Sequence, residues 1–169
     1  MADTPDRGPL PLTNDMADRI DWKKGDGLVP AIVQNAEDGQ VLMFGYMNHD
    51  ALMATLESGY VTFYSRSKKR LWMKGESADS GLACVDGAMD CDGDTLLVRV
   101  RPAGPACHTG ARTCFGDSLP QGAGFLAALD ELVRDRRAEM PEGSYTTSLF
   151  DAGKARIAQK VGEEGVELA

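Results

Sequence analysis

Apolar and polar residues alternate in short runs after residue 27, and turn residues separate the runs. Two apolar runs, Leu28–Val33 and Val41–Tyr46, flank the pair Asp38-Gly39, and this pattern predicts a β-hairpin. The segment 48–59 then places leucines and a methionine on one helical face, with an asparagine before it and a glycine at its end. We expect an α-helix there, capped by the asparagine and stopped by the glycine.

The next segments have the composition of β-structure. Residues 60–67 alternate and are rich in β-branched and aromatic side chains, which predicts a strand, and 68–77 continue as a basic strand or loop. A further strand is expected at 94–102, where a proline ends it. Residues 103–116 are rich in Gly, Pro and Thr and are typical of a structured loop. This part of the chain therefore belongs to the α+β class.

The periodicity changes to a helical one near the C-terminus. Apolar residues recur at intervals of three and four between Gly122 and Arg137, which predicts an amphipathic helix. Residues 139–150 are expected to be a linker whose Thr147 or Ser148 caps a last helix over 151–169. That helical pattern stops without a C-cap, so we expect an incomplete α-helical fragment.

Length and charge set limits on function. The chain has 169 residues, enough for one domain or for one domain and a fragment. Its net charge of −8 argues against general binding to nucleic acid, and no apolar run approaches the length of a membrane span. Residues 1–18 are polar and rich in proline, so we expect a flexible arm, not a signal peptide, and a cytoplasmic protein.

Three aspartates at every second position form the first candidate site. In an extended strand Asp90, Asp92 and Asp94 share one face, where their repulsion favours a hard cation such as Mg²⁺, while Cys91 points to the opposite face. A solvated turn is the alternative. An EF-hand loop fits poorly, because its twelfth position holds Arg101 where glutamate is needed.

The cysteines form the second candidate site. In a secreted chain the four would suggest two disulfides, but in a reducing cytosol clustered cysteines more often bind metal or do chemistry. Cys107 and Cys114 lie in one loop, with His108 beside the first, and together with Cys91 they match a catalytic Zn²⁺ site that keeps one position open for water. Buried, chemically inert cysteines are the alternative, because the Cys107–Cys114 spacing is not a standard zinc-finger spacing.

Five segments resemble, in order, the signature segments of phosphoribosyl-AMP cyclohydrolase, an enzyme family of histidine biosynthesis. They are "GLVPAIVQ", "VLMFGYMN", "VTFYSRSKKRLWMKGES", "DCDGDTLL" and "GPACHTGARTCFGD". Further on, "SYTTSLFDAGKARIAQKVGEEGVELA" is similar to the opening half of phosphoribosyl-ATP pyrophosphohydrolase, which follows the cyclohydrolase in fused bifunctional enzymes. We therefore expect an arm at 1–18, a cyclohydrolase domain at 19–118 and a truncated pyrophosphohydrolase-like segment at 119–169.

The resemblance implies a fold, two metals and a reaction. It implies a β-rich core that forms an intertwined homodimer, and hydrolysis of the N1–C6 bond of the adenine ring by zinc-activated water with magnesium assistance. It places the Mg²⁺ ligands on Asp90, Asp92 and Asp94. It places the Zn²⁺ ligands, drawn from both subunits, on Cys91, Cys107 and Cys114.

Other residues are candidates for proton transfer and substrate binding. His108 either carries a proton to a ring nitrogen or orients its loop. Trp72 either stacks on the base or packs in the core. The basic residues suit a substrate with two phosphates, and a solvated strand face is their alternative; they are Arg66, Lys68, Lys69, Arg70 and Lys74.

One segment departs from the family pattern. Ala78 and Asp79 stand where the family carries Ser-Gly, and an aspartate there would repel substrate phosphate, so a catalytically impaired metal-bound dimer is one alternative.

By resemblance the carboxylates of the second part belong to a pyrophosphohydrolase metal motif; they are Glu163, Glu164 and Glu167. We expect no pyrophosphohydrolase activity from an incomplete helical segment, and the remaining alternative is a bifunctional enzyme.

Overall fold

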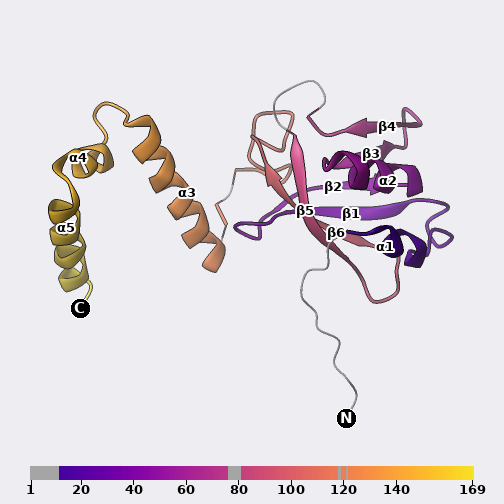
Figure 1. Ribbon diagram of the computed structural model, residues 1–169, viewed down its shortest axis with the longest axis horizontal. Coiled ribbons are helices and arrows are strands. Elements are labelled where there is room, and N and C mark those ends of the chain that lie inside the picture. The colour runs from indigo at the N-terminus through magenta and orange to yellow at the C-terminus, as the bar shows by residue number, and fades with distance from the viewer. Residues whose placement is uncertain (1–11, 76–80, 118, 121) are drawn as a thin grey trace, which may run out of the picture. The chain divides into compact units, whose positions relative to one another are not determined.

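The computed structural model describes residues 12–75, 81–117, 119–120 and 122–169, which fall into two units, Met1–Pro120 and Gln121–Ala169 (Figure 1). A four-stranded sheet of order β2-β1-β6-β5 forms the centre of the first unit. Its hairpin pairs β1 (Val29–Asn35) with β2 (Val41–Met47), as the sequence predicts. The expected α+β class is confirmed.

The other two strands of this sheet bring distant segments beside the hairpin. β6 (Leu96–Pro102) runs parallel to β1, and β5 (Leu82–Met89) lies antiparallel to β6 at the edge. The hydrophobic pattern predicts β6 but not β5, because β5 carries Asp86 and Gly87 among small residues. The sharp turn between β5 and β6 holds the acidic residues of the first candidate site.

Two helices and a second hairpin complete this unit. α1 (Asn14–Arg19) precedes the sheet, and α2 (His49–Ser58) follows β2. The predicted ends of α2 are confirmed, because the Asn48 side chain accepts the Ala51 N–H and the residue after the helix, Gly59, is left-handed. β3 (Thr62–Ser65) and β4 (Arg70–Met73) form a two-stranded antiparallel sheet.

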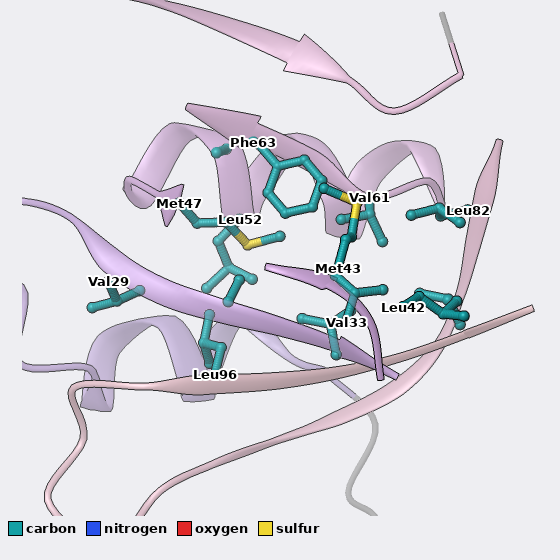
Figure 2. Packing of buried hydrophobic residues seen from close by; sticks show 14 of the residues in the cluster. Val29, Val33, Leu42, Met43, Met47, Leu52, Val61, Phe63, Leu82 and Leu96 are labelled. Atoms are coloured by element: carbon teal, nitrogen blue, oxygen red, sulfur yellow. The ribbon is translucent and has the colours of Figure 1, made fainter. Parts of the chain in front are cut away.

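The hydrophobic core lies between the larger sheet, α2 and β3 (Figure 2). Val33 of β1, Leu52 of α2 and Phe63 of β3 are fully buried within it. Each such side chain contributes about 1.5–3 kcal/mol on burial. Gly45 of β2 lies against Phe63, where an added Cβ would be 2.4 Å from a ring carbon, so glycine is what allows the ring to sit so close to the sheet.

Part of the expected N-terminal arm is ordered in this unit. Met16 and Ala17 of α1 are buried in the core, and the Trp22 indole donates to the Ala17 carbonyl at 3.1 Å. Within the described residues, the segment 14–18 therefore differs from the flexible arm that the sequence suggests. The short apolar pattern of α1 is too brief to distinguish from an isolated turn by periodicity.

The second unit consists of α3 (Ala123–Glu139), α4 (Tyr145–Ala152) and α5 (Lys154–Glu167). The linker predicted at 139–150 is wrong, because much of it forms α4, whose N-cap is Ser144 and not Thr147 or Ser148. Leu126, Leu132 and Val161 are among the large apolar side chains that this unit leaves exposed. No helix among the described residues is long and apolar enough to cross a membrane.

Candidate functional site

Asp90, Asp92 and Asp94, here called the aspartate cluster, lie in the turn between β5 and β6. The prediction of an extended strand is wrong at this point, because Gly93 is left-handed (φ 76°) and reverses the chain. The turn nevertheless gathers the carboxylates, and one oxygen of each lies within 4.8 Å of the others. Their proximity comes from the turn and not from strand alternation.

Hydrogen bonds within the turn fix the position of Asp90. Its Oδ1 accepts the N–H groups of Asp94 at 3.0 Å and Thr95 at 3.1 Å. Burial acts to raise the pKa of the Asp90 carboxyl, but the N–H donors of Thr95 and Asp94 outweigh it and hold this pKa below its ordinary value. Asp90 is therefore ionised in the folded chain at neutral pH.

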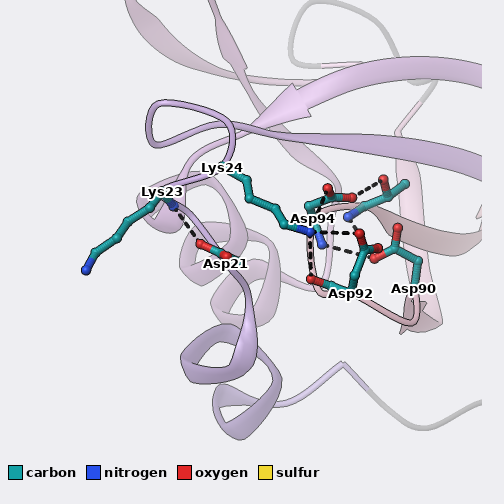
Figure 3. Close-up of polar contacts among 7 residues, drawn as sticks. Asp21, Lys23, Lys24, Asp90, Asp92 and Asp94 are labelled. Carbon is teal, nitrogen blue, oxygen red and sulfur yellow. Dashed lines mark hydrogen bonds and ion pairs between the residues drawn. The ribbon is translucent and has the colours of Figure 1, made fainter.

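Lys24, whose role no sequence pattern indicates, reaches this cluster. The Lys24 Nζ donates to Asp92 Oδ2 at 2.7 Å and to Asp94 Oδ2 at 3.3 Å (Figure 3). The hydrogen bond to Asp92 is the main cause of the raised pKa of Lys24, with Asp94 adding to it. Carboxylate oxygens are the ligands that a hard metal such as Mg²⁺ prefers, but in this structure two of the three carboxylates bond Lys24.

The second candidate site is the segment 106–116, here called the thiol loop, which carries Cys107 and Cys114. The Thr109 hydroxyl donates to Cys107 Sγ at 3.1 Å and lowers the pKa of that thiol. The two thiols interact with each other: the pKa of Cys114 is raised by burial and then by Cys107. The Lys74 ammonium acts to lower the pKa of both thiols. This pair fits a thiolate-binding metal.

The thiol loop is fastened to the β1–β2 hairpin at two points. The Cys114 N–H donates to the Leu42 carbonyl of β2 at 2.8 Å. The Arg112 guanidinium forms an ion pair with Asp38, whose side chain is only 2% exposed. The sequence gives Asp38 a place in a turn but nothing that pairs it with Arg112, so this contact was missed.

Cys91 is exposed in the turn of the aspartate cluster. Among the residues that the structure describes, the only group of three or more His, Cys, Asp or Glu side chains with ligand atoms within 4.8 Å of one another is the aspartate cluster. Cys91 therefore does not join Cys107 and Cys114 within one chain. The three-cysteine zinc set, shared between subunits, and the intertwined homodimer remain predictions.

The remaining cysteine is set apart chemically. Cys84 lies on β5, where burial, with help from Asp86, raises the pKa of its thiol to about 11. The ligand sets that the resemblance implies do not include Cys84.

The other predicted site residues lie at several places in the first unit. His108 is exposed, with Nδ1 3.9 Å from Cys107 Sγ. Trp72 packs against Phe63, with ring centroids 5.1 Å apart. Arg66, Lys69 and Arg70 are exposed at the β3–β4 turn.

Two of the predicted substrate-binding residues have informative neighbours. The Arg66 guanidinium carbon lies 3.9 Å from the centroid of the Tyr46 ring, a cation–π contact. Lys74 follows β4 and is the basic residue of this group that acts on the thiols of Cys107 and Cys114. The departure at Ala78 and Asp79 lies outside the described residues.

The glutamates of the second unit pair with cations on their own helix. Glu163 Oε1 accepts a hydrogen bond from Gln159 Nε2 at 2.9 Å, and it forms an ion pair with a guanidinium nitrogen of Arg156 at 3.6 Å. Lys160 reaches Glu164 at 2.6 Å and Glu163 at 3.5 Å, while Glu167 is exposed. Their proposed metal role is not tested by these contacts.

Comparisons with known proteins identify both parts of the chain. The sequence model of the phosphoribosyl-AMP cyclohydrolase family matches residues 43–116, and that of the phosphoribosyl-ATP pyrophosphohydrolase family matches residues 126–169. Relatives named histidine biosynthesis bifunctional protein HisIE align along most of the chain. The protein of Xanthomonas campestris pv. campestris is 57% identical over 92% of this chain and 74% of its own length. That of Escherichia coli K12 is 55% identical over 94% of this chain and 77% of its own.

These matches correct one expectation. The incomplete second domain is not borne out, because the pyrophosphohydrolase family matches 126–169 and bifunctional relatives align across both parts. The expected lack of pyrophosphohydrolase activity rested on that incompleteness; the chain spans about three quarters of the length of these relatives, and this activity stays a proposal.

Proposed function

The chain belongs to the family of bifunctional histidine biosynthesis proteins HisIE, and from this membership we propose that its first unit opens the adenine ring of phosphoribosyl-AMP by hydrolysis of the N1–C6 bond. The observation that carries this proposal is the match of residues 43–116 to the cyclohydrolase family. The aspartate cluster and the thiol loop both lie within that range, and both have ligand chemistry that suits a metal-dependent hydrolase.

We propose ligands for two metals. The aspartate cluster would hold Mg²⁺, and Cys107 and Cys114 would hold Zn²⁺ together with Cys91 of the partner subunit. Zinc held there would act as a Lewis acid and would lower the pKa of a water molecule enough to make it a nucleophile at neutral pH. In the free chain, the Thr109 hydroxyl favours the thiolate form of Cys107, the form that binds metal.

The remaining residues have proposed roles in binding and proton transfer. Arg66, Lys69 and Arg70 offer cationic groups to the two substrate phosphates. Opening the ring leaves N1 in need of a proton, and His108, exposed beside the thiol loop, is the proposed donor. Together these residues bind the phosphates away from the reacting ring carbon and supply a proton where the bond breaks.

The test follows the loss of purine absorbance when phosphoribosyl-AMP is added to the full chain. Cys107→Ser should abolish turnover and zinc retention, whereas Cys84→Ser, a matched thiol removal on β5, should leave both within about twofold. A zinc chelator should stop the wild type and zinc should restore it. Unchanged turnover in Cys107→Ser removes zinc from the mechanism. Zinc retention in a dimer without any turnover would favour the non-catalytic metal-bound module.

A second activity is proposed for residues 126–169, hydrolysis of phosphoribosyl-ATP to phosphoribosyl-AMP and pyrophosphate. The match of this region to the pyrophosphohydrolase family supports it. Glu164→Gln should reduce pyrophosphate release strongly, while Glu139→Gln at the end of α3 should not. The Cys107→Ser variant should still release pyrophosphate at the wild-type rate. Wild-type protein that releases none would refute this second activity without touching the first.

A further inference from the structure

Lys24 lies in a tightly bonded turn, residues 21–27, between α1 and β1. The Gly27 N–H donates to the Trp22 carbonyl at 2.7 Å, and the Leu28 N–H donates to the Gly25 carbonyl at 2.9 Å. At Gly25 an added Cβ would lie 1.8 Å from the Leu28 carbonyl oxygen, so the turn needs glycine directly after Lys24. The backbone at Lys24 is therefore fixed.

This turn is joined to the turn of the aspartate cluster. The Asp21 N–H donates to the Gly93 carbonyl at 2.7 Å, which places the two turns side by side. The Lys24 Nζ then contacts the Asp92 carbonyl oxygen at 3.4 Å as well as the carboxylates of Asp92 and Asp94 (Figure 3). Backbone hydrogen bonds thus hold the base of the Lys24 side chain beside the cluster.

The ammonium and a divalent cation need the same oxygens. Lys24 bonds Oδ2 of Asp92 and Oδ2 of Asp94, and these residues supply two of the three carboxylates available to a metal. An ammonium has only donors, so it cannot share a metal's ligand position, and its charge repels a dication at a few ångströms. The Lys24 side chain is 41% exposed on a flexible stem, so it can leave into water when a metal enters.

We propose that Lys24 is an internal competitor of the divalent cation at the aspartate cluster, and that the cation displaces the Lys24 ammonium when it binds. The proposal rests on the proposed function, because it takes the cluster to be the magnesium site. In the metal-free chain Lys24 neutralises part of the repulsion among the three carboxylates. By doing so it lowers the affinity of the aspartate cluster for the divalent cation. The lysine therefore sets the cation concentration at which the cluster fills.

The experiment measures Mn²⁺ binding to the full chain by the electron paramagnetic resonance of free Mn²⁺, with Mn²⁺ as the probe for the hard-cation site. Lys24→Met should bind Mn²⁺ about five- to tenfold more tightly, because a paired cation has been removed from the ligands. The matched control is Lys23→Met, which removes the same charge one residue earlier from a side chain that points away from the cluster (Figure 3). It should change the affinity by less than about twofold at 0.15 M salt.

Two further variants separate the possible outcomes. Lys24→Arg keeps the charge and should bind like the wild type; if it binds as tightly as Lys24→Met, charge competition is refuted. The double variant Asp92→Asn, Asp94→Asn locates the site. If it loses a Mn²⁺ ion and Lys24→Met binds no more tightly than wild type, the competitor role is refuted and the magnesium site stands. If the double variant binds Mn²⁺ like wild type, the magnesium site itself fails and the competitor role fails with it.

Discussion

Among single residues, Cys107 and Cys84 differ most in how readily their thiols ionise. The Thr109 hydroxyl lowers the pKa of Cys107, whereas burial raises that of Cys84 to about 11 from an ordinary value of 9.0. At pH 8 the thiolate fraction of Cys84 is then roughly 100-fold below that of an ordinary thiol. We expect iodoacetamide to modify Cys107 well before Cys84 in the metal-free protein, as measured by mass spectrometry of the peptides.

The pH dependence of this reaction has a defined sign. Because the pKa of Cys107 is lowered, its rate should reach half of its maximum below pH 9, and because that of Cys84 is raised, its rate should reach half of its maximum only near pH 11. In urea both thiols should react alike. Equal rates in the folded protein would show that neither environment acts as described.

A second residue-scale prediction concerns the Asp38–Arg112 ion pair. Arg112→Met leaves the buried Asp38 carboxylate without this partner, so we expect a loss of about 2 kcal/mol in the free energy of unfolding, less than for a fully buried pair because Arg112 is partly exposed. Urea denaturation measures it. The control is Arg101→Met, which breaks the exposed pair with Glu37 in the same turn and should cost less than about 0.5 kcal/mol. Equal losses of unfolding free energy in the two variants would contradict the conclusion that the burial of Asp38 makes its ion pair the more important one.

The sequence predicts residue types at the site better than it predicts their partners. The aspartates and cysteines were candidates because few other side chains bind metals, and this chemistry is visible without a fold. Lys24 and Arg112 carry common surface charges, and their partners lie 68 and 74 residues away in the chain. Only the packing of the turns against each other gives these two residues a role.

At the scale of elements, prediction succeeded where a local signal decides the structure. The β1–β2 hairpin follows from its turn residues and apolar runs, and α2 follows from its cap and its terminal glycine. β5 was missed because pairing with β6 stabilises it despite a weak pattern. α4 was missed because the Pro and Gly before it suggest a linker, although they only precede its Ser144 cap.

The turn that carries the aspartate cluster depends on Gly93, whose left-handed backbone is the reason that the predicted extended strand does not form there. Gly93→Ala forces a left-handed alanine whose Cβ would lie 3.2 Å from the Arg19 carbonyl oxygen. We expect a loss of about 1–2 kcal/mol in unfolding free energy and weaker Mn²⁺ binding, because the turn holds the carboxylates together. Gly143→Ala, also at positive φ but with open space around it, should cost about 1 kcal/mol and leave Mn²⁺ binding unchanged. Unchanged Mn²⁺ binding in both variants would show that the turn does not shape the site.

At the scale of the whole molecule, the zinc proposal depends on symmetry. Within one chain Cys91 is not grouped with Cys107 and Cys114. A twofold dimer would bring Cys91 of each subunit to the thiol loop of the other, and the two resulting sites would be identical. A variant that lacks Cys91 and a variant that lacks a thiol-loop cysteine should then complement each other, because a dimer of the two contains one intact site.

Co-expression of Cys91→Ser and Cys107→Ser chains therefore tests the shared site directly. In a mixed dimer, one site loses both cysteines, but the other combines an intact Cys91 with an intact thiol loop. Random assembly makes half the dimers mixed, so phosphoribosyl-AMP hydrolysis and zinc content should return to about a quarter of wild type. Co-expression of Cys107→Ser with Cys114→Ser should restore nothing, because both lesions lie in the thiol loop and each site contains one. Rescue in neither pair would refute zinc ligands that cross between subunits, since each chain would then have to complete its own site.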